Sequence, residues 1–295
     1  MYPPRFSLIV PSTVEEALDA LSRYGEEAKV LAGGHSLIPL MKLRLASPKY
    51  LIYIGKIQGL SYIREEAGKI SIGCMTTHAM IESSDLLRKK NLLLSETASK
   101  IGDLQVRNMG TIGGSLAHAD PAADYPAAIT ALEGEIVARS VKGERVIKAQ
   151  EFFKGPFSTA LRSDELLVEV RVPSMEGYFG AAYEKLVFRA TDYAIVGVAA
   201  VLELDRGGAI QRARVALTGV GSTPVRAKSV EEELIGKQAS KDLIVKVSTR
   251  ASEGLNPPSD IRASSEYRKA MAAVMTKRAL LRALERAQEK IASNG

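Results

Sequence analysis

The N-terminal segment alternates short apolar runs with amphipathic stretches. Ser12 or Thr13 is placed to cap a first helix, and residues 36–44 have the pattern of a second, shorter one. The apolar runs that flank these helices have the length of strands and lie at Phe6–Val10, Lys29–Ala32 and Tyr50–Ile54. The order strand–helix–strand–helix–strand predicts a small βαβ unit with a parallel sheet.

From residue 60 onward, short strands come in adjacent pairs that are joined by turn residues, which favours antiparallel pairing. The predicted strands are residues 61–64, 69–72, 135–138, 144–148 and 166–172. The predicted helices begin near His78, at Asn91 and at Asp124, and the last two end at Ser99 and Leu132. This part of the chain therefore reads as a mixed α+β subdomain.

Residues 173–177 (PSMEG) form a plausible boundary before a third unit. Three predicted strands, residues 180–188, 194–204 and 210–217, are followed by predicted helices at 229–235, 241–253 and 267–292. The turn 205–208 (DRGG) favours a hairpin between the last two strands. We therefore expect an α+β fold with units 1–55, 56–176 and 177–295.

Two glycine-rich segments stand out as candidate chemistry. Thr111–Ser115 (TIGGS) is followed nine residues later by Asp124, and Ala32–Ser36 (AGGHS) has the same small-Gly-Gly-polar form. A Gly-Gly pair permits φ > 0 and can turn successive N–H groups toward one anion, usually a phosphate. Either segment alone is better explained as an ordinary tight loop. Two such segments, each before an apolar stretch, suggest two walls around one diphosphate.

Composition narrows the chemistry. With one cysteine, Cys74, the chain cannot hold an iron–sulfur cluster or a cysteine-rich zinc site, because these need several thiolates. Any redox role then requires an organic cofactor here and metal centres on another chain. No apolar run has the length of a membrane span, and no signal-peptide pattern opens the chain, so we expect a cytoplasmic protein.

The net charge of +6 has two interpretations: a solvated surface rich in lysine and arginine, or a basic face for an acidic protein subunit. Nucleic acid is disfavoured as the partner, because only 5% of residues are aromatic, tryptophan is absent, and no basic–aromatic stripe occurs.

Taken together, the glycine segments and their neighbours resemble one family. AGGHS at 32–36, TIGGS at 111–115, ADPAADYP at 119–126, Lys185 and Asp192–Ala194 resemble the FAD-binding medium subunit of the molybdenum hydroxylases. That family includes carbon monoxide dehydrogenase medium chains, the flavin domain of xanthine dehydrogenase and archaeal aldehyde or glyceraldehyde oxidoreductase medium chains. The resemblance covers essentially the whole chain. It implies a PCMH-type (vanillyl-alcohol-oxidase-like) FAD-binding fold of two subdomains, followed by a three-stranded antiparallel sheet with a helical bundle.

The resemblance also implies which residues bind FAD. The two glycine segments would hold the dinucleotide, Asp124 its sugar hydroxyls, Lys185 the pyrimidine end of the flavin ring, and Tyr193 the isoalloxazine. The full set is Ala32, Gly33, Gly34, His35, Ser36, Leu37, Ile101, Thr111, Ile112, Gly113, Gly114, Ser115, His118, Asp124, Leu167, Lys185 and Tyr193. No catalytic residue and no metal ligand is assigned to this chain.

Several of these residues have plainer alternatives. Asp124 could be a helix N-cap, Lys185 a solvated lysine, and Tyr193 a packing residue at the start of a strand. Ile101 and Leu167 read as ordinary core residues.

The implied function is electron transfer. Electrons would pass from a large molybdenum-cofactor chain, through a small chain with [2Fe–2S] clusters, to FAD on this chain and then to an external acceptor, within a dimer of heterotrimers. A second possibility is a free-standing FAD-dependent oxidoreductase of the same fold, although no side chain declares itself as its acid or base. A third is an α/β scaffold whose glycine segments are only turns.

Replacing Gly114 by Val is expected to abolish FAD binding, because a β-branched side chain penalises φ > 0 and blocks close approach of the backbone. Flavin absorbance of the purified, folded variant measures this. A Gly114→Val protein that stays yellow would show that the segment is misassigned.

Overall fold

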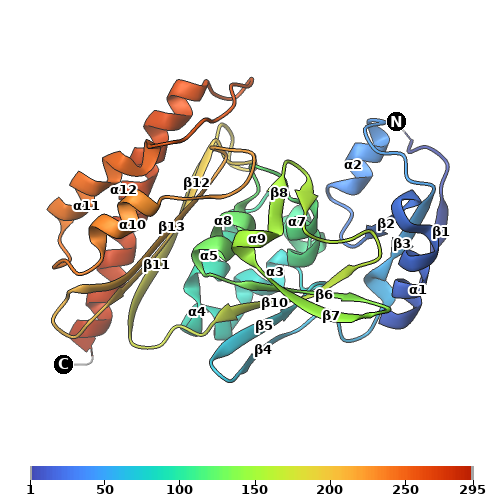
Figure 1. Cartoon of the computed structure of the whole chain (residues 1–295), viewed down its shortest axis with the longest axis horizontal. Helices are drawn as coiled ribbons and strands as arrows, with labels where there is room; N and C mark the ends of the chain where they lie inside the picture. The colour runs from blue at the N-terminus through green and yellow to red at the C-terminus, as the bar shows by residue number, and fades with distance from the viewer. Residues whose placement is uncertain (1, 294–295) are drawn as a thin grey trace.

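The computed structural model describes residues 2–293, whose elements form three groups along the long axis of the molecule (Figure 1). The first group contains strands β1 (Ser7–Ile9), β2 (Ala28–Leu31) and β3 (Tyr50–Tyr53) with helices α1 (Val14–Tyr24) and α2 (Leu37–Lys42). Strand β3 lies between β1 and β2 and is parallel to both, which confirms the predicted βαβ unit. Thr13 caps α1, since its hydroxyl accepts a hydrogen bond from the Glu16 N–H at 3.2 Å.

The second group is built on an antiparallel sheet in the order β4-β5-β10-β6-β7. Its strands are β4 (Ile63–Glu66), β5 (Lys69–Gly73), β6 (Glu135–Ser140), β7 (Gly143–Lys148) and β10 (Leu166–Pro173). A short hairpin, β8 (Phe153–Gly155) with β9 (Ser158–Thr159), lies apart from this sheet. All four pairings in the sheet are antiparallel, as the sequence predicts.

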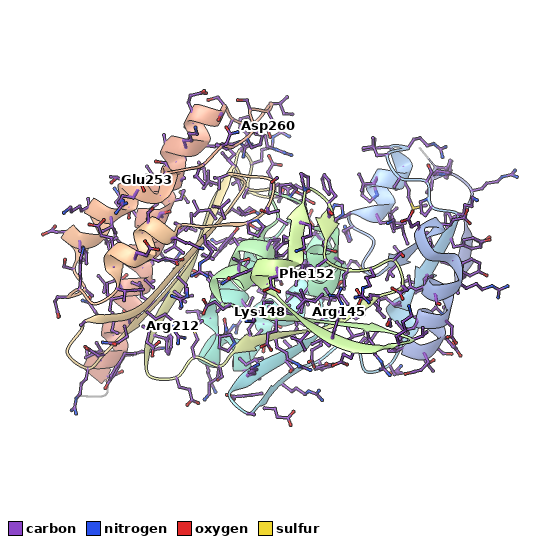
Figure 2. All side chains as sticks on the ribbon, viewed as in Figure 1. Arg145, Lys148, Phe152, Arg212, Glu253 and Asp260 are labelled. Carbon is purple, nitrogen blue, oxygen red and sulfur yellow. The ribbon has the colours of Figure 1, made fainter. Side chains whose placement is uncertain are left out.

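Helices of the second group include α7, α8 and α9 on one side of this sheet (Figure 1). The helices are α3 (His78–Ser83), α4 (Asp85–Lys90), α5 (Leu92–Ser99), α6 (Leu104–Met109), α7 (Ile112–His118), α8 (Asp124–Ala131) and α9 (Ala149–Phe152). Helix α6 is not predicted by the sequence pattern, because it has only six residues and its apolar ends, Leu104 and Met109, face solvent rather than a core. Helix α4, equally short, was also missed. Phe152 at the end of α9, labelled in Figure 2, is fully buried in the core.

The third group is a four-stranded antiparallel sheet covered by helices. Its strands are β11 (Tyr178–Leu186), β12 (Val196–Leu204), β13 (Ile210–Thr218) and β14 (Val225–Arg226), and its helices α10 (Lys228–Leu234), α11 (Lys241–Ser248) and α12 (Ser265–Ser293). The expected three-stranded sheet is therefore wrong by one strand. With two residues, β14 is too short to show an alternating pattern, and it pairs with β13 only through residues 216–217. Single 3-10 turns occur at residues 25–27, 54–56 and 249–252.

Both faces of this sheet are buried, as β12 shows. Ala199 and Val201 face the core that is shared with the first two groups, whereas Val198, Ala200 and Leu202 face a second core under α12. In Figure 1, α12 lies on one face of the sheet, and α5 and α8 lie on the other. Burial on both sides explains why the sequence of β12 (VGVAAVLEL) is a continuous apolar run instead of an alternation. No helix within residues 2–293, α12 included, is long and apolar enough to cross a membrane.

Helix α12 packs directly on the backbone of β11 at Gly180. A Cβ at this position would lie 1.8 Å from the Ala283 carbonyl oxygen and 2.7 Å from the Ala287 nitrogen. We predict that Gly180→Ala lowers the free energy of unfolding by about 3 kcal/mol, because helix and strand must separate to admit the methyl group. Urea unfolding measures this. The control is Gly155→Ala, whose Cβ would meet nothing closer than 4.0 Å and which we expect to be near neutral. Equal effects of the two substitutions would contradict the prediction.

His78 is a buried histidine at the start of α3, after the Thr77 cap. Its ring lies 5.3 Å from the Tyr125 ring, and within residues 2–293 its Nδ1 has no hydrogen-bond partner. Burial lowers the pKa of His78 to about 4, and the charges of His35 and Arg107 act in the same direction.

Between pH 6.5 and 4 the unfolded chain therefore binds more protons at His78 than the folded chain does. The free energy of unfolding must fall as the pH falls through this window, by about 3 kcal/mol from this residue. We predict that His78→Gln removes this part of the pH dependence, measured by urea unfolding at several pH values. Identical slopes for the two proteins would show that His78 does not titrate in this way.

Candidate functional site

The two glycine segments lie against each other although they are far apart in the sequence. A Cβ at Gly33 would lie 2.0 Å from the Met109 carbonyl oxygen and 2.9 Å from the Gly110 Cα. A Cβ at Gly114 would lie 3.7 Å from that of Ala32. The turn after β2 therefore packs backbone to backbone on the connection between α6 and α7, and only glycine permits this distance at position 33.

The first segment presents backbone donors that the protein leaves unused. Gly34 has φ of 75°, as the sequence suggested for this pair. Within residues 2–293, no protein acceptor receives a hydrogen bond from the N–H groups of Gly33, Gly34, His35 or Ser36. His35 is exposed, and Leu37 opens α2 directly behind the turn. A row of four free N–H donors suits an anion such as a diphosphate.

The second segment is organised differently. Gly113 and Gly114 lie in the first turn of α7, and neither has a positive φ, so the prediction of a φ > 0 turn here is wrong. Its N–H groups are also engaged. Ile112 donates to the Thr76 carbonyl at 3.1 Å, Gly113 to the Cys74 carbonyl at 3.0 Å, Gly114 to the Thr111 hydroxyl at 3.1 Å, and Ser115 to the Thr111 carbonyl at 3.0 Å. Within residues 2–293, the backbone N–H groups available to an anion are therefore those of residues 33–36 and not those of residues 112–115.

Glycine is still required in the second segment, for reasons of space. A Cβ at Gly113 would lie 2.5 Å from the Cβ of Cys74, which is itself buried, and one at Gly114 would lie 2.9 Å from the Thr111 hydroxyl. A valine at 114 would therefore displace the residue that caps α7. The loss of binding expected for Gly114→Val now rests on this contact and not on φ.

Asp124 lies at the start of α8 with its carboxylate buried in a closed set of contacts. One oxygen accepts a hydrogen bond from the Tyr183 hydroxyl at 2.6 Å, and the other pairs with the Lys185 ammonium at 2.8 Å. Asp124 is not an N-cap, because Ala123 holds that position and no side-chain cap is made. Burial raises the pKa of Asp124, and the Lys185 charge and the Tyr183 hydrogen bond oppose the rise.

Lys185 is not a solvated lysine, since its side chain is 5% exposed. Its ammonium donates to the Lys100 carbonyl at 2.9 Å as well as to Asp124. It reaches the wall of a cleft of about 510 Å³. The other residues lining this cleft are Ser99, Lys100, Gly102, Asp103, Leu104, Arg107, Val187, Ala190 and Thr191.

Arg107 supports the loop beside this cleft. Its guanidinium donates to the carbonyls of Ile101 at 3.1 Å and Gly102 at 3.2 Å, and pairs with Glu82 at 2.8 Å. These contacts fix Ile101 in a half-buried position next to the core. Ile101 thus lies next to cleft-lining residues, in a loop held in place by a charged side chain.

Tyr193 joins the third group of elements to the first segment. Its phenol lies near the Ser36 side chain, and the residue is 40% exposed. Burial raises the pKa of Tyr193, the Asp120 charge adds to the rise, and Ser36 opposes it. Tyr193 lies in the loop before β12, and the Ala194 N–H in the same loop donates to the Ala122 carbonyl at 3.3 Å.

The remaining two residues of the predicted set, His118 and Leu167, lie on α7 and β10. His118 ends α7 with its ring 5.0 Å from that of Phe157, and burial lowers its pKa. Leu167 is a core residue, 4% exposed, on β10. Their predicted contact with the cofactor stays a prediction.

Two residues that shape this site, Tyr183 and Arg107, were not among the predicted site residues. Tyr183 could have been found, because a strand over residues 180–188 places positions 183 and 185 on one face, next to the same partner. Arg107 carried no such signal, since the helix that positions it was itself not predicted.

Comparison with known proteins identifies the family. Residues 4–175 match the family described as the FAD binding domain in molybdopterin dehydrogenase, and residues 181–283 match the CO dehydrogenase flavoprotein C-terminal domain. The chain is 42% identical over 279 residues to the glyceraldehyde dehydrogenase medium chain of Sulfolobus acidocaldarius, covering 95% of this chain and 98% of that protein. It is 41% identical over 280 residues to the carbon monoxide dehydrogenase medium chain of Hydrogenophaga pseudoflava, covering 95% and 97%.

A solved structure agrees. The carbon monoxide dehydrogenase of Hydrogenophaga pseudoflava contains a chain that superposes with a TM-score of 0.94 at 43% identity, covering 97% of this chain and 99% of that one. The free N–H donors at residues 33–36 and the close contact at Gly33 suit the diphosphate of the cofactor in the family's description. The chain belongs to the family of FAD-binding medium subunits of the molybdenum hydroxylases.

Proposed function

We propose that this chain is the FAD-binding electron-transfer subunit of a heterotrimeric molybdenum hydroxylase of the aldehyde oxidoreductase or carbon monoxide dehydrogenase type. The observation that carries the proposal is the turn at residues 33–36. Its four N–H groups donate to no protein group within residues 2–293, and a glycine contact holds it against the second segment. FAD, when bound, supplies the capacity to accept electrons from a [2Fe–2S] chain and to release them to an external acceptor.

Different residues of this chain bind different parts of the cofactor. The N–H groups of Gly33 to Ser36 bind the diphosphate, and α2 behind them adds the positive end of its dipole. Asp124 is buried and held by Tyr183 and Lys185, and it would accept a sugar hydroxyl through the lone pairs that these two bonds leave unused. Tyr193, beside Ser36, packs on the ring system.

The fold proposed for this function is of the PCMH type. In it, units 1–55 and 56–176 form the two FAD-binding subdomains and 177–295 a C-terminal unit. The parallel sheet of the first group and the antiparallel sheet of the second support the two-subdomain division.

Partners are part of the proposal. A large molybdenum-cofactor chain and a small [2Fe–2S] chain would complete a heterotrimer in the cytoplasm, and two heterotrimers would pair. Relatives named as medium chains support this, and so does the cysteine content, because Cys74 alone cannot hold a cluster and is buried. Relatives that differ in substrate match this chain almost equally well, so the proposal includes both the aldehyde oxidoreductase type and the carbon monoxide dehydrogenase type.

The test is an absorption spectrum and a gel of the purified chain with whatever co-purifies. Flavin bands, with iron–sulfur absorbance that follows a small partner chain, are the expected result. Flavin with rapid turnover of a small substrate by this chain alone would instead indicate a free-standing oxidoreductase. A folded chain that binds no flavin would contradict both.

Flavin absorbance of the purified chain also tests the role of the turn at residues 33–36. We predict that Gly33→Ala lowers FAD affinity by roughly tenfold or more, since a methyl group there must separate the two segments at a cost of about 1–3 kcal/mol. Gly155→Ala, outside the site, is the control and should bind FAD as the parent does. Unchanged affinity in Gly33→Ala would remove the turn from the proposal.

A further inference from the structure

We propose that Glu96, acting through Tyr183, is a positioning residue that sets the orientation of Asp124 in the cofactor site. This inference rests on the proposed function, because it assigns a role toward FAD. Glu96 lies on α5 and touches none of the glycine segments, so nothing in the sequence pattern pointed to it. It binds the strand that carries both partners of Asp124.

Glu96 is held by two arginines of α12. Arg286 contacts both of its oxygens, at 2.9 and 3.1 Å, and Arg282 pairs with it as well. Although burial raises the pKa of Glu96, the hydrogen bonds from Arg286 and Tyr183 hold it below its usual value. Arg286 also donates to the Ala181 carbonyl at 2.5 Å. The carboxylate is thus charged, largely buried and fixed.

From this fixed position Glu96 takes a hydrogen bond from the strand. The backbone N–H of Tyr183 donates to its Oε2 at 3.0 Å. This N–H is on β11, opposite Ala199 of β12, in the middle of the strand. Loss of the acceptor would leave a buried donor unpaired, which is costly and favours a local shift of the strand.

Tyr183 also connects this fixed point of the strand to Asp124. The Tyr183 side chain is fully buried, and its hydroxyl donates to Asp124 at 2.6 Å. Two residues along on the same face, Lys185 pairs with the other oxygen. A shift of β11 at Tyr183 would therefore move both donors at once and rotate or release the carboxylate.

A second glutamate offers a matched control. Glu231 on α10 is buried, accepts the Val215 N–H of β13 at 2.7 Å, and accepts hydrogen bonds from Nε and Nη2 of Arg226 at 2.6 and 2.7 Å. It repeats the Glu96 arrangement, a carboxylate between an arginine and a strand N–H, but contacts no residue of the site. Glu96→Ala and Glu231→Ala should both lower the melting temperature.

The experiment measures the dissociation constant of FAD for the cofactor-stripped full chain, with thermal unfolding in parallel. We expect Glu96→Ala to weaken FAD binding roughly tenfold, the scale on which partners of a ligating group act, and Glu231→Ala to leave it unchanged. Glu96→Gln, which keeps an oxygen for the Tyr183 N–H, should recover much of the affinity. Because both residues act on Asp124, Glu96→Ala combined with Tyr183→Phe should cost little more than the larger single effect.

Each other outcome is decisive. Parent-like FAD affinity in Glu96→Ala, additive effects in the double variant, or equal weakening in Glu231→Ala would overturn the inference while leaving the proposed function in place. If Glu96→Ala does not fold, Tyr183→Phe replaces it, because it removes the hydroxyl that donates to Asp124, and parent-like FAD affinity in that variant is the contradicting result. A parent chain that binds no FAD would overturn the proposed function itself.

Discussion

A contact between two backbones, at Gly33, is the constraint on which the site depends. The turn after β2 can reach the Met109–Gly110 peptide only because position 33 has no side chain. This contact joins the parallel βαβ unit to the helices of the antiparallel subdomain, and it places four unused N–H donors at the junction. The donors cost little while they face solvent, but a cofactor must satisfy them once it excludes water. The N–H donors of the candidate site therefore lie where the two units meet.

The third group of elements is part of this arrangement and not an appendage. Its sheet is buried on both faces, so α12 on one side and α5 with α8 on the other must pack at fixed distances, and Gly180 permits the close approach of α12. Strand β11 carries Tyr183 and Lys185 to Asp124, and the loop before β12 carries Tyr193 to Ser36. The C-terminal elements thus contribute to a candidate site whose glycine turn, residues 33–36, lies near the N-terminus.

The sequence predicted features that depend on neighbouring residues better than contacts between residues far apart in the chain. The βαβ unit, the antiparallel pairs and the 205–208 turn all follow from periodicity and turn residues within a few positions, and the structure has them. The two glycine segments were also identified, but their similar sequences did not reveal that the first leaves its N–H groups unpaired within residues 2–293 while the second forms the start of a helix. Thr111 caps a helix, and the next two residues donate to the carbonyls of residues 76 and 74, which are 36 and 39 positions away, so no local rule reveals these bonds. Short elements such as α6 and β14 failed for lack of length, and the Glu96 contacts for lack of any periodic signal.

Asp124 and Lys185 show why the site needs such wide support. A buried ion pair gains little net free energy, since the desolvation of both charges offsets most of their attraction. Burial indeed raises the pKa of Asp124 against the pull of Lys185 and Tyr183. The pair is therefore a poor explanation for stability. It makes sense as a device that keeps one carboxylate in one orientation, and this requires that its donors cannot move. The Tyr183 hydroxyl and the Lys185 ammonium meet that requirement because β11 is clamped by Glu96 and two arginines of α12. A geometry that costs free energy locally is held by packing elsewhere, which is the arrangement expected of a binding site and not of a core.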